Sequence, residues 1–152
     1  MSTVKPRDPN WDARCRAVFE NQPIVHTLGI MMEKLEPGFC EMRMPFRPDL
    51  TQQTGYLHAG IVATLADNAA GLAACSLMSA DAQPLAIEFK INLMAPAKGE
   101  LLIARARVLK SGHTLTVCSI DVSTIDGGRE RDVAVMQLTG IAFVPDHVPP
   151  GK

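Results

Sequence analysis

The chain has 152 residues, of which 47% are hydrophobic and 20% are charged, and its formal net charge is −1. This length suits one domain with a real core, and the composition excludes a disordered chain. The balanced charge excludes the basic surface that is typical of nucleic-acid-binding proteins, so we expect no nucleic-acid partner.

The N-terminal segment predicts one short helix after a polar start. Residues 1–16 lack the apolar core of a secretion signal. Residues 10–22 carry apolar side chains at spacings of three and four, which is typical of an amphipathic helix, and Asn10 can cap it. We expect Pro23 to end this helix, because proline breaks the backbone hydrogen-bond pattern.

Two extended runs follow, near residues 29–35 and 39–46. Between them lies Pro37-Gly38, a dipeptide typical of turns, so this region predicts a β-hairpin. Residues 47–58 are rich in polar and turn-forming side chains. We expect them to form a loop that leads to the next element.

The most apolar long stretch, TGYLHAGIVATLADNAAGLAACS, follows at residues 54–76. Its composition predicts a helix over residues 59–78. Such a helix is about long enough to span a bilayer. Asp67 and Asn68 lie at its middle, however, so we expect a buried helix of a soluble protein and no membrane partner.

Four long runs with alternating or β-branched side chains complete the chain and predict four strands. They are residues 85–94, 99–110, 113–125 and 131–144, with turns at 111–112 and 126–128. In the first run, alternate apolar residues share one expected face: Ile87, Phe89, Ile91 and Leu93. We expect the tail at 146–152 to be frayed.

The predicted order is therefore a helix, two strands, one long helix and four strands. This order is typical of an α+β domain in which an antiparallel sheet wraps around a central helix. Such a sheet explains why the helix at 59–78 is apolar nearly all round. We expect residues 1–152 to form this single domain.

One side of the central helix consists almost entirely of small residues. They are Gly60, Ala63, Thr64, Asp67, Ala70, Gly71 and Ala74. Small side chains let another backbone approach closely, so we expect Asp67 to face the sheet or a second copy of the helix. No Lys or Arg occurs between Pro48 and Phe89. A desolvated carboxylate without a basic partner is a candidate for acid–base or nucleophilic chemistry, and a structural hydrogen bond is the alternative.

The start of this helix is the second candidate group, because its free N–H groups and positive dipole end suit a developing oxyanion. Ala59 and Asp67 are eight residues apart. That is about 12 Å along a helix, too far for both groups to act on one carbonyl. Two antiparallel helices related by a two-fold axis bring the start of one beside the middle of the other. This geometry predicts a homodimer with two equal sites.

The segment GYLHAGIVATLADNAAG resembles the HGG…AD…G segment of the PaaI-type acyl-CoA thioesterases of the hot-dog superfamily. The segment INLMAPAKGELLIARARVLKSGHTLTVCSIDV resembles the pattern of strand, PAK-type turn, long strand, turn and strand in the same family. The likeness extends over residues 29–144. It implies a hot-dog fold and hydrolysis of an acyl or aryl-acyl CoA thioester by a homodimer that pairs into a homotetramer.

The resemblance also implies roles for individual residues. Asp67 matches the catalytic acid, acting as a general base on water or as a nucleophile. His58 and Ala59 match the His-Gly pair at the helix start, where the N–H of the second residue polarises the thioester carbonyl. For His58 itself, a cap of the helix or a hydrogen bond to a loop carbonyl is the alternative to a catalytic role. Ala59 replaces the glycine but keeps its N–H. Gln52 falls where several relatives carry an asparagine that positions water or the carbonyl, and its neighbour Gln53 is the alternative for this role.

Four further positions complete the expected site. Gly60, Thr64 and Asn68 lie beside the catalytic residues on the helix, and we expect them to contact the substrate. Ala86 falls where some relatives carry a serine or threonine near the attacking water. Other groups are expected to hold the water in this chain.

The cysteines are expected to be structural. Cys15, Cys40, Cys75 and Cys118 form no CxxC pair, which is typical of reduced thiols in a cytoplasmic protein. Cys75 is expected to be inert, because nothing in the sequence lowers its pKa. No His, Asp and Glu residues lie at metal-ligand spacing, so neither a metal nor a cofactor is expected.

Two other functions are consistent with these residues. A hot-dog hydratase or dehydratase needs a His–carboxylate pair, which only His58 and Asp67 of two protomers supply. A non-catalytic acyl-CoA-binding module is the other alternative. Four basic strand residues are candidates for contacts to CoA phosphates, although a solvated strand face is the better interpretation of each: Lys90, Arg105, Arg107 and Lys110.

Overall fold

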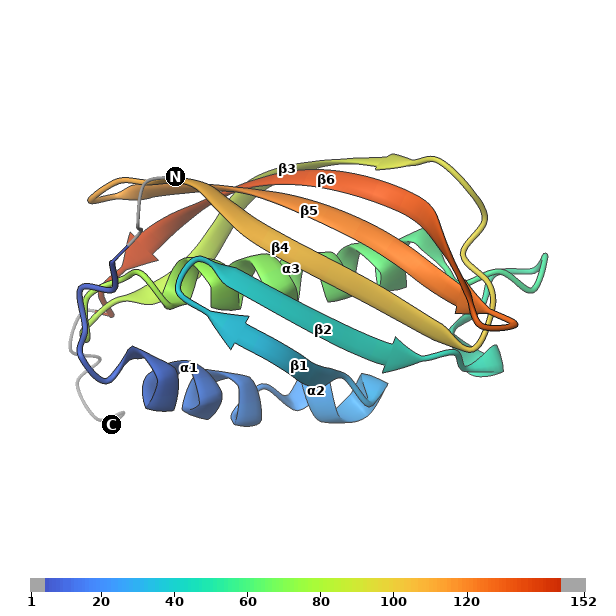
Figure 1. Ribbon diagram of the computed structural model, residues 1–152, viewed down its shortest axis with the longest axis horizontal. Helices are drawn as coiled ribbons and strands as arrows, with labels where there is room; N and C mark the ends of the chain where they lie inside the picture. The colour runs from blue at the N-terminus through green and yellow to red at the C-terminus, as the bar shows by residue number, and fades with distance from the viewer. Residues whose placement is uncertain (1–4, 146–152) are drawn as a thin grey trace, which may run out of the picture.

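In the computed structural model, which describes residues 5–145, a six-stranded antiparallel sheet curls around one long helix (Figure 1). The strands are β1 (Met31–Glu36), β2 (Phe39–Pro45), β3 (Gln83–Leu93), β4 (Leu101–Ser111), β5 (Leu115–Asp126) and β6 (Arg129–Phe143). Their order in the sheet is β1-β2-β4-β5-β6-β3. The α+β prediction is therefore confirmed, whereas the expected frayed tail at 146–152 lies outside the described residues.

The central helix, α3 (Ala59–Cys75), begins at the predicted residue and ends three residues before the predicted Met78. It packs against β2, β3, β4 and β5, which explains its apolar composition. Its small-residue side is the less covered one, since Ala63, Thr64, Asp67 and Gly71 remain partly exposed there. No helix within residues 5–145 has both the length and the apolar character needed to cross a bilayer.

The N-terminal helix α1 (Trp11–Glu20) confirms the predicted helix but not its cap. Asn10 precedes the helix, yet its side chain forms no capping hydrogen bond, and its N–H instead donates to Asp8 Oδ1 at 2.8 Å. A second helix, α2 (Pro23–Leu28), was not predicted. Proline is favoured in the first turn of a helix because its missing N–H is not needed there, so Pro23 starts a helix as well as ending one.

Helix α1 is fixed to the C-terminal end of α3 by Arg14. The guanidinium pairs with Asp8 at 2.7 Å, and it donates to the carbonyl oxygens of Cys75, Met78 and Ala82 at 3.0 to 3.2 Å. A cation at this end of α3 also faces the negative end of the helix dipole. The sequence gives no sign that these segments meet, because they lie more than 60 residues apart.

Strand β3 forms one edge of the sheet, and its apolar side chains are uncovered. A bulge between Ala86 and Glu88 leaves Ile87 without a partner on β6, so the predicted strict alternation is interrupted there. Exposed apolar residues follow the strand and its end: Leu85, Ile87, Phe89, Leu93 and Met94. An exposed apolar edge strand is typical of a surface that pairs with another chain.

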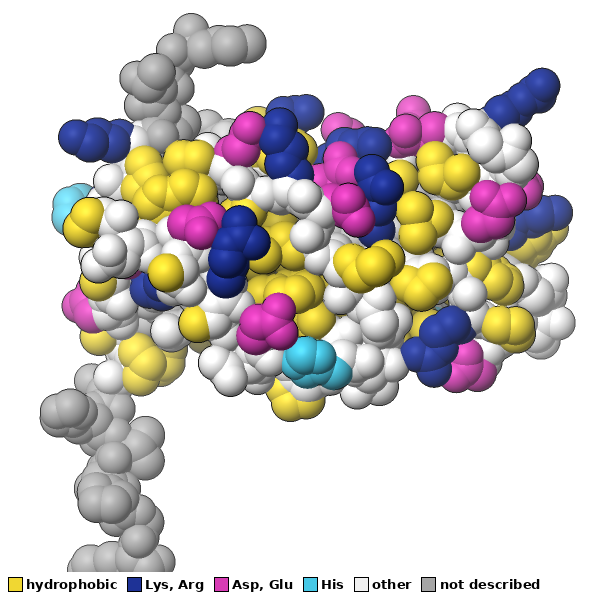
Figure 2. Space-filling model, turned by 60° about the horizontal axis from the view of Figure 1, so that its bottom comes forward, with side chains coloured by type: hydrophobic (Ala, Val, Ile, Leu, Met, Phe, Trp, Pro, Cys, Tyr) yellow, Lys and Arg dark blue, Asp and Glu magenta, His cyan; other side chains and the backbone are white. Residues whose placement is uncertain are grey.

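On the outer face of the sheet, opposite charges are paired. Arg105 donates to Glu41 at 2.8 Å and pairs with Glu130, while Arg107 lies over the ring of Phe39, 4.7 Å from its centroid. Figure 2 shows Lys and Arg side chains lying beside Asp and Glu side chains on the molecular surface. Arg105 and Arg107 therefore lie on the same face of the sheet, and both side chains have partners.

Candidate active site

Two cavities lie along α3, and the one at the start of the helix is called the Ala59 cavity. Its volume is about 470 Å³. It is lined by Gln52, Thr54, Tyr56, Leu57, Ala59, Val62, Leu93, Met94, Ala95, Pro96, Ala97 and Val133. Its walls thus come from the loop before α3, the helix itself, and the end of the edge strand β3.

The first turn of α3 leaves one amide free to face this cavity. His58 Nδ1 accepts the N–H of Gly60 at 2.9 Å, and the His58 carbonyl oxygen accepts the N–H groups of Ile61 and Val62. Among the described residues, the Ala59 N–H has no acceptor. The imidazole of His58 is therefore a helix cap, and the Ala59 amide remains as a donor at the positive end of the helix.

A tight loop places Gln52 in the same cavity. The N–H of Gln52 donates to Tyr56 O at 2.9 Å, and Gly55, at a φ of 81°, donates its N–H back to Gln52 O at 2.9 Å. The left-handed backbone at Gly55 is a conformation that glycine adopts without strain. Gln53 is exposed and lines neither cavity, so the structure brings Gln52, but not Gln53, to Ala59.

The second cavity lies at the middle of α3 and is called the Asp67 cavity. Its volume is about 400 Å³. It is lined by Val18, Gln22, Asp67, Asn68, Gly71, Leu72, Ala74, Gln83, Pro84, Leu85, Ala86, Leu138 and Gly140. The predicted positions Asp67, Asn68 and Ala86 therefore lie together in this cavity.

Asp67 is the ionisable group of this cavity. No ion pair among residues 5–145 includes it. Burial raises its pKa above the ordinary value of 3.8, because desolvation penalises the charged form. A partly buried carboxylate with a raised pKa is a suitable proton acceptor at neutral pH.

The other three helix positions, Gly60, Thr64 and Asn68, differ in whether their polar groups already have hydrogen-bond partners. Thr64 Oγ1 donates to Gly60 O at 2.8 Å, and Asn68 Nδ2 donates to Thr64 O at 2.9 Å. The Gly60 amide is occupied by His58. Asn68 Oδ1, in contrast, is buried without a hydrogen-bond partner in the described structure. Of these three residues, only Asn68 lines a cavity with Asp67.

Some lining residues were not predicted from the sequence. Val18 and Gln22 come from α1 and the residue that precedes α2, and they close one side of the Asp67 cavity. Val18 is one of the apolar residues whose spacing predicted the amphipathic helix at residues 10–22. No sequence signal links residues 18–22 to the middle of α3, since the contact depends on how α1 packs.

The expectation that nothing lowers the pKa of Cys75 is wrong. A hydrogen bond from Cys15 and the nearby Arg14 guanidinium, whose Nη1 lies 3.2 Å from Cys75 Sγ, lower the pKa of this thiol. Both cysteines are fully buried. No group of His, Cys, Asp and Glu side chains within residues 5–145 is arranged to hold a metal ion.

The curled sheet around one long helix is the architecture expected of the hot-dog fold. Residues 54–130 match the model of the Thioesterase superfamily. The chain belongs to this superfamily, and it is a thioester hydrolase. The matched region contains the start of α3, Asp67 and the strands β3 to β5.

Individual relatives agree with this assignment. A Thioesterase family protein from Silicibacter pomeroyi has 44% sequence identity and a TM-score of 0.87, with 89% of this chain and 99% of that chain covered. Human acyl-coenzyme A thioesterase 13 is 35% identical over 104 residues, which cover 66% of this chain and 71% of that protein. The E. coli PaaI protein shares the fold, with a TM-score of 0.79 at 21% identity over 88% of this chain and 94% of that chain.

Proposed function

We propose that this protein is an acyl-CoA thioesterase that hydrolyses an acyl or aryl-acyl CoA thioester to the free acid and CoA. The observation that carries the proposal is that α3 presents two groups: a free backbone amide at Ala59, and a desolvated carboxylate at Asp67 that forms no ion pair among the described residues. Such a pair supplies an oxyanion donor and a base, the two groups that acyl transfer to water requires. The similarity to human acyl-coenzyme A thioesterase 13 supports CoA as the thiol carrier.

We propose that each active site is shared between two protomers. The partly exposed small-residue side of α3 allows a second α3 to lie close and antiparallel, and the apolar edge of β3 can pair with its copy. This arrangement places the Ala59 cavity of one protomer beside the Asp67 cavity of its partner. Pairing of two such dimers gives the proposed homotetramer.

In this site, the Ala59 N–H polarises the thioester carbonyl and stabilises the developing negative charge on its oxygen. Asp67 of the partner subunit accepts a proton from the water that attacks the carbonyl carbon, or attacks that carbon itself to form a mixed anhydride, which water hydrolyses to the free acid after the thiol has left. The C–S bond then breaks, and the CoA sulfur leaves and takes up a proton. Gln52, which lines the Ala59 cavity, orients the carbonyl or the water.

The remaining elements of the proposal follow from the same chemistry. Gly60, Thr64 and Asn68 contact the substrate along α3. The reaction consumes only water, and we propose that the Ala59 amide and the Asp67 carboxylate carry it out without a metal or a redox cofactor. Four free, buried cysteines are typical of a reducing compartment, and we propose a cytoplasmic location.

A thiol-release assay tests this function directly. The protein is incubated with arylacetyl-, hydroxybenzoyl- and medium-chain acyl-CoA thioesters, and free CoA is measured with a thiol reagent. We expect at least one thioester to be hydrolysed with turnover. Hydration of an enoyl-CoA without thiol release would instead indicate a hydratase, and tight binding without either product would indicate a binding module.

A further inference from the structure

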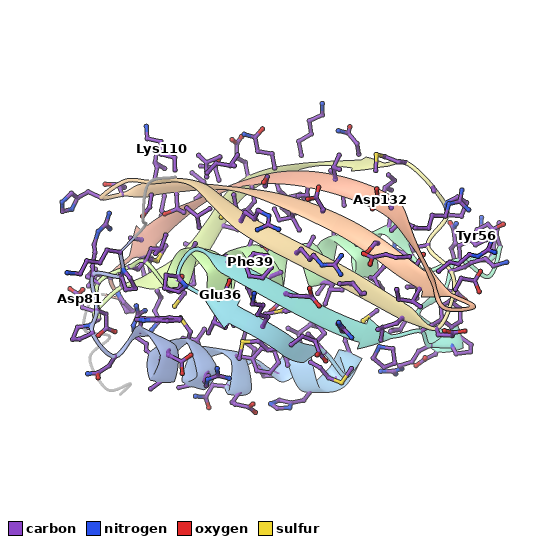
Figure 3. All side chains as sticks on the ribbon, viewed as in Figure 1. Glu36, Phe39, Tyr56, Asp81, Lys110 and Asp132 are labelled. Atoms are coloured by element: carbon purple, nitrogen blue, oxygen red, sulfur yellow. The ribbon has the colours of Figure 1, made fainter. Side chains whose placement is uncertain are left out.

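A third cavity adjoins the Ala59 cavity and is called the Lys98 cavity. Its volume is about 220 Å³, and it is lined by Tyr56, Pro96, Lys98, Thr124, Asp126 and Arg131. It shares Tyr56 and Pro96 with the Ala59 cavity, so the two are neighbours. Figure 3 shows Tyr56 at one end of the molecule, opposite the end that carries Lys110.

The side chain of Arg131 projects from the face of the sheet on which the Ala59 cavity lies. It is directly opposite Thr124 on β5, which in turn is opposite the buried Leu102 on β4. Opposed residues in a sheet project to the same face, so Arg131 lies on the inner, helix-covered side. A register shift next to Val133 allows that residue to line the Ala59 cavity from the same strand.

Lys98 is placed by a tight loop between β3 and β4. The Leu57 N–H donates to Ala97 O at 2.9 Å, which ties this loop to the segment that leads into α3. Gly99 has a φ of 129°, and a Cβ there would overlap the carbonyl oxygen of Ile125 at the end of β5. Only glycine fits this approach, so the backbone on both sides of Lys98 is held against the rim of the cavity.

The two basic side chains that line this cavity, Lys98 and Arg131, are free to bind an anion. Neither Lys98 nor Arg131 forms an ion pair within residues 5–145, and Asp126 is the one carboxylate among the lining residues. The groove beside the Asp67 cavity contains a different cation, Arg14, but that guanidinium is held by Asp8 and by backbone carbonyls.

The four basic residues considered from the sequence are poorer candidates. Arg105 is paired with Glu41 and Glu130, and Arg107 stacks on Phe39. Lys90 lies in a small groove that shares no lining residue with the Ala59 cavity, and Lys110 lies at the opposite end from Tyr56. Free positive charge next to the proposed site is therefore found at Lys98 and Arg131.

We infer that Lys98 and Arg131 bind the phosphates of the coenzyme A nucleotide. The substrate then has one orientation: the CoA arm runs through the Ala59 cavity towards Tyr56, and the acyl group enters the Asp67 cavity of the partner subunit. Arginine and lysine are the side chains that suit phosphate oxygens, and the hydroxyl of Thr124 lies among the same lining residues as a further donor. This inference rests on the proposed function.

The test compares two substrates that carry the same acyl group. One is the acyl-CoA, and the other is the N-acetylcysteamine thioester, which lacks the nucleotide and its phosphates. For Lys98→Ala combined with Arg131→Ala, we expect the ratio of kcat/KM for acyl-CoA to kcat/KM for the truncated thioester to fall about tenfold or more, mainly through KM. The matched control Lys110→Ala should leave this ratio unchanged.

Further variants and a salt titration make the test decisive. Lys98→Arg and Arg131→Lys keep the charge and should retain most of the ratio. Added salt should raise the wild-type KM for acyl-CoA more than that of the double variant, because screening weakens charge contacts. An unchanged ratio in the double variant would overturn the inference while leaving the thioesterase intact, whereas a wild-type protein that hydrolyses no thioester would overturn the proposed function itself.

Discussion

Ala59 and Asp67 belong to the same helix, yet they line two different cavities. Along the helix axis the two residues are separated by about 12 Å, because each residue advances the helix by about 1.5 Å. A reacting carbonyl in contact with the amide of one protomer is therefore beyond the reach of that protomer's own carboxylate. In the proposed site the complementary half comes from a second α3, and the less covered side of the helix allows it to approach.

Replacement of Asp67 by asparagine should remove most turnover without unfolding the protein. The amide preserves the size of the side chain but cannot accept a proton from water. General-base catalysis typically contributes about 10² to 10⁴ in rate, and we expect kcat to fall by a factor in this range. Thiol release measures the loss, and circular dichroism checks the fold. Asp121→Asn, at an exposed site on β5, is the matched control; normal turnover in the Asp67 variant would refute its assignment as the base.

A mixing experiment tests the sharing of the site. Ala59→Pro removes the free N–H, and proline is favoured at this first helical position, where His58 already has the extended backbone that proline requires before it. Alone, this variant and Asp67→Asn should each be nearly inactive. Mixed in equal amounts after unfolding and refolding, they should regain about a quarter of wild-type turnover, since half of the dimers are mixed and each mixed dimer has one intact site.

A site contained within one protomer makes the opposite prediction. Every chain in the mixture then carries a defect in its own site, and the mixture stays as inactive as its components. The Asp67→Asn variant alone, unfolded and refolded in the same way, is the control and gives the residual turnover against which the mixture is compared.

The free energy of unfolding should depend on pH in a way that reflects the raised pKa of Asp67. Because the folded-state pKa lies above the ordinary value of 3.8, the ionised carboxylate disfavours folding. This penalty is absent below the unfolded-state pKa and complete above the folded-state pKa. Asp67→Asn should therefore increase the free energy of unfolding more at pH 7 than at pH 4, as measured by urea denaturation. An equal change at both pH values would contradict the burial of this carboxylate.

Removal of Arg14 should destabilise the protein through the end of α3. Arg14→Met keeps the length of the side chain but loses three hydrogen bonds to backbone carbonyls, each worth about 1 kcal/mol, so a loss of about 3 kcal/mol is expected in urea denaturation. Arg16→Met is the control on the same helix, because its exposed pair with Asp12 should contribute less than about 0.5 kcal/mol. Similar losses in both variants would show that Arg14 does not fix the helix end.

A charge on the edge strand should separate the protomers. Ile87 is 53% exposed at the bulge of β3, and Ile87→Lys should shift the protein to monomers and abolish turnover, as measured by analytical ultracentrifugation and thiol release. Leu109→Lys, at a residue that is 62% exposed on β4, is the control and should keep both the dimer and its turnover. A monomeric Ile87 variant with full turnover would exclude the shared site.

The sequence by itself determined the elements and their kind. Alternating and helical spacing of apolar residues is a local property of the chain, and it was sufficient to predict α3, the hairpin and the four long strands near their observed bounds. The contrast between the apolar composition of α3 and its central Asp67 also identified the candidate carboxylate before any contact was known. Helix α2 was missed because proline was interpreted only as a helix stop.

Only the tertiary structure decided which residues meet. Strand order and the packing of α1 bring Val18 to the Asp67 cavity, Arg14 to the end of α3, and Lys98 and Arg131 to one rim. These residues are distant in the chain, and their contacts depend on sheet curvature, bulges and burial, which no local spacing encodes. Spacing along a chain fixes periodicity, whereas proximity in space depends on how the periodic elements pack together.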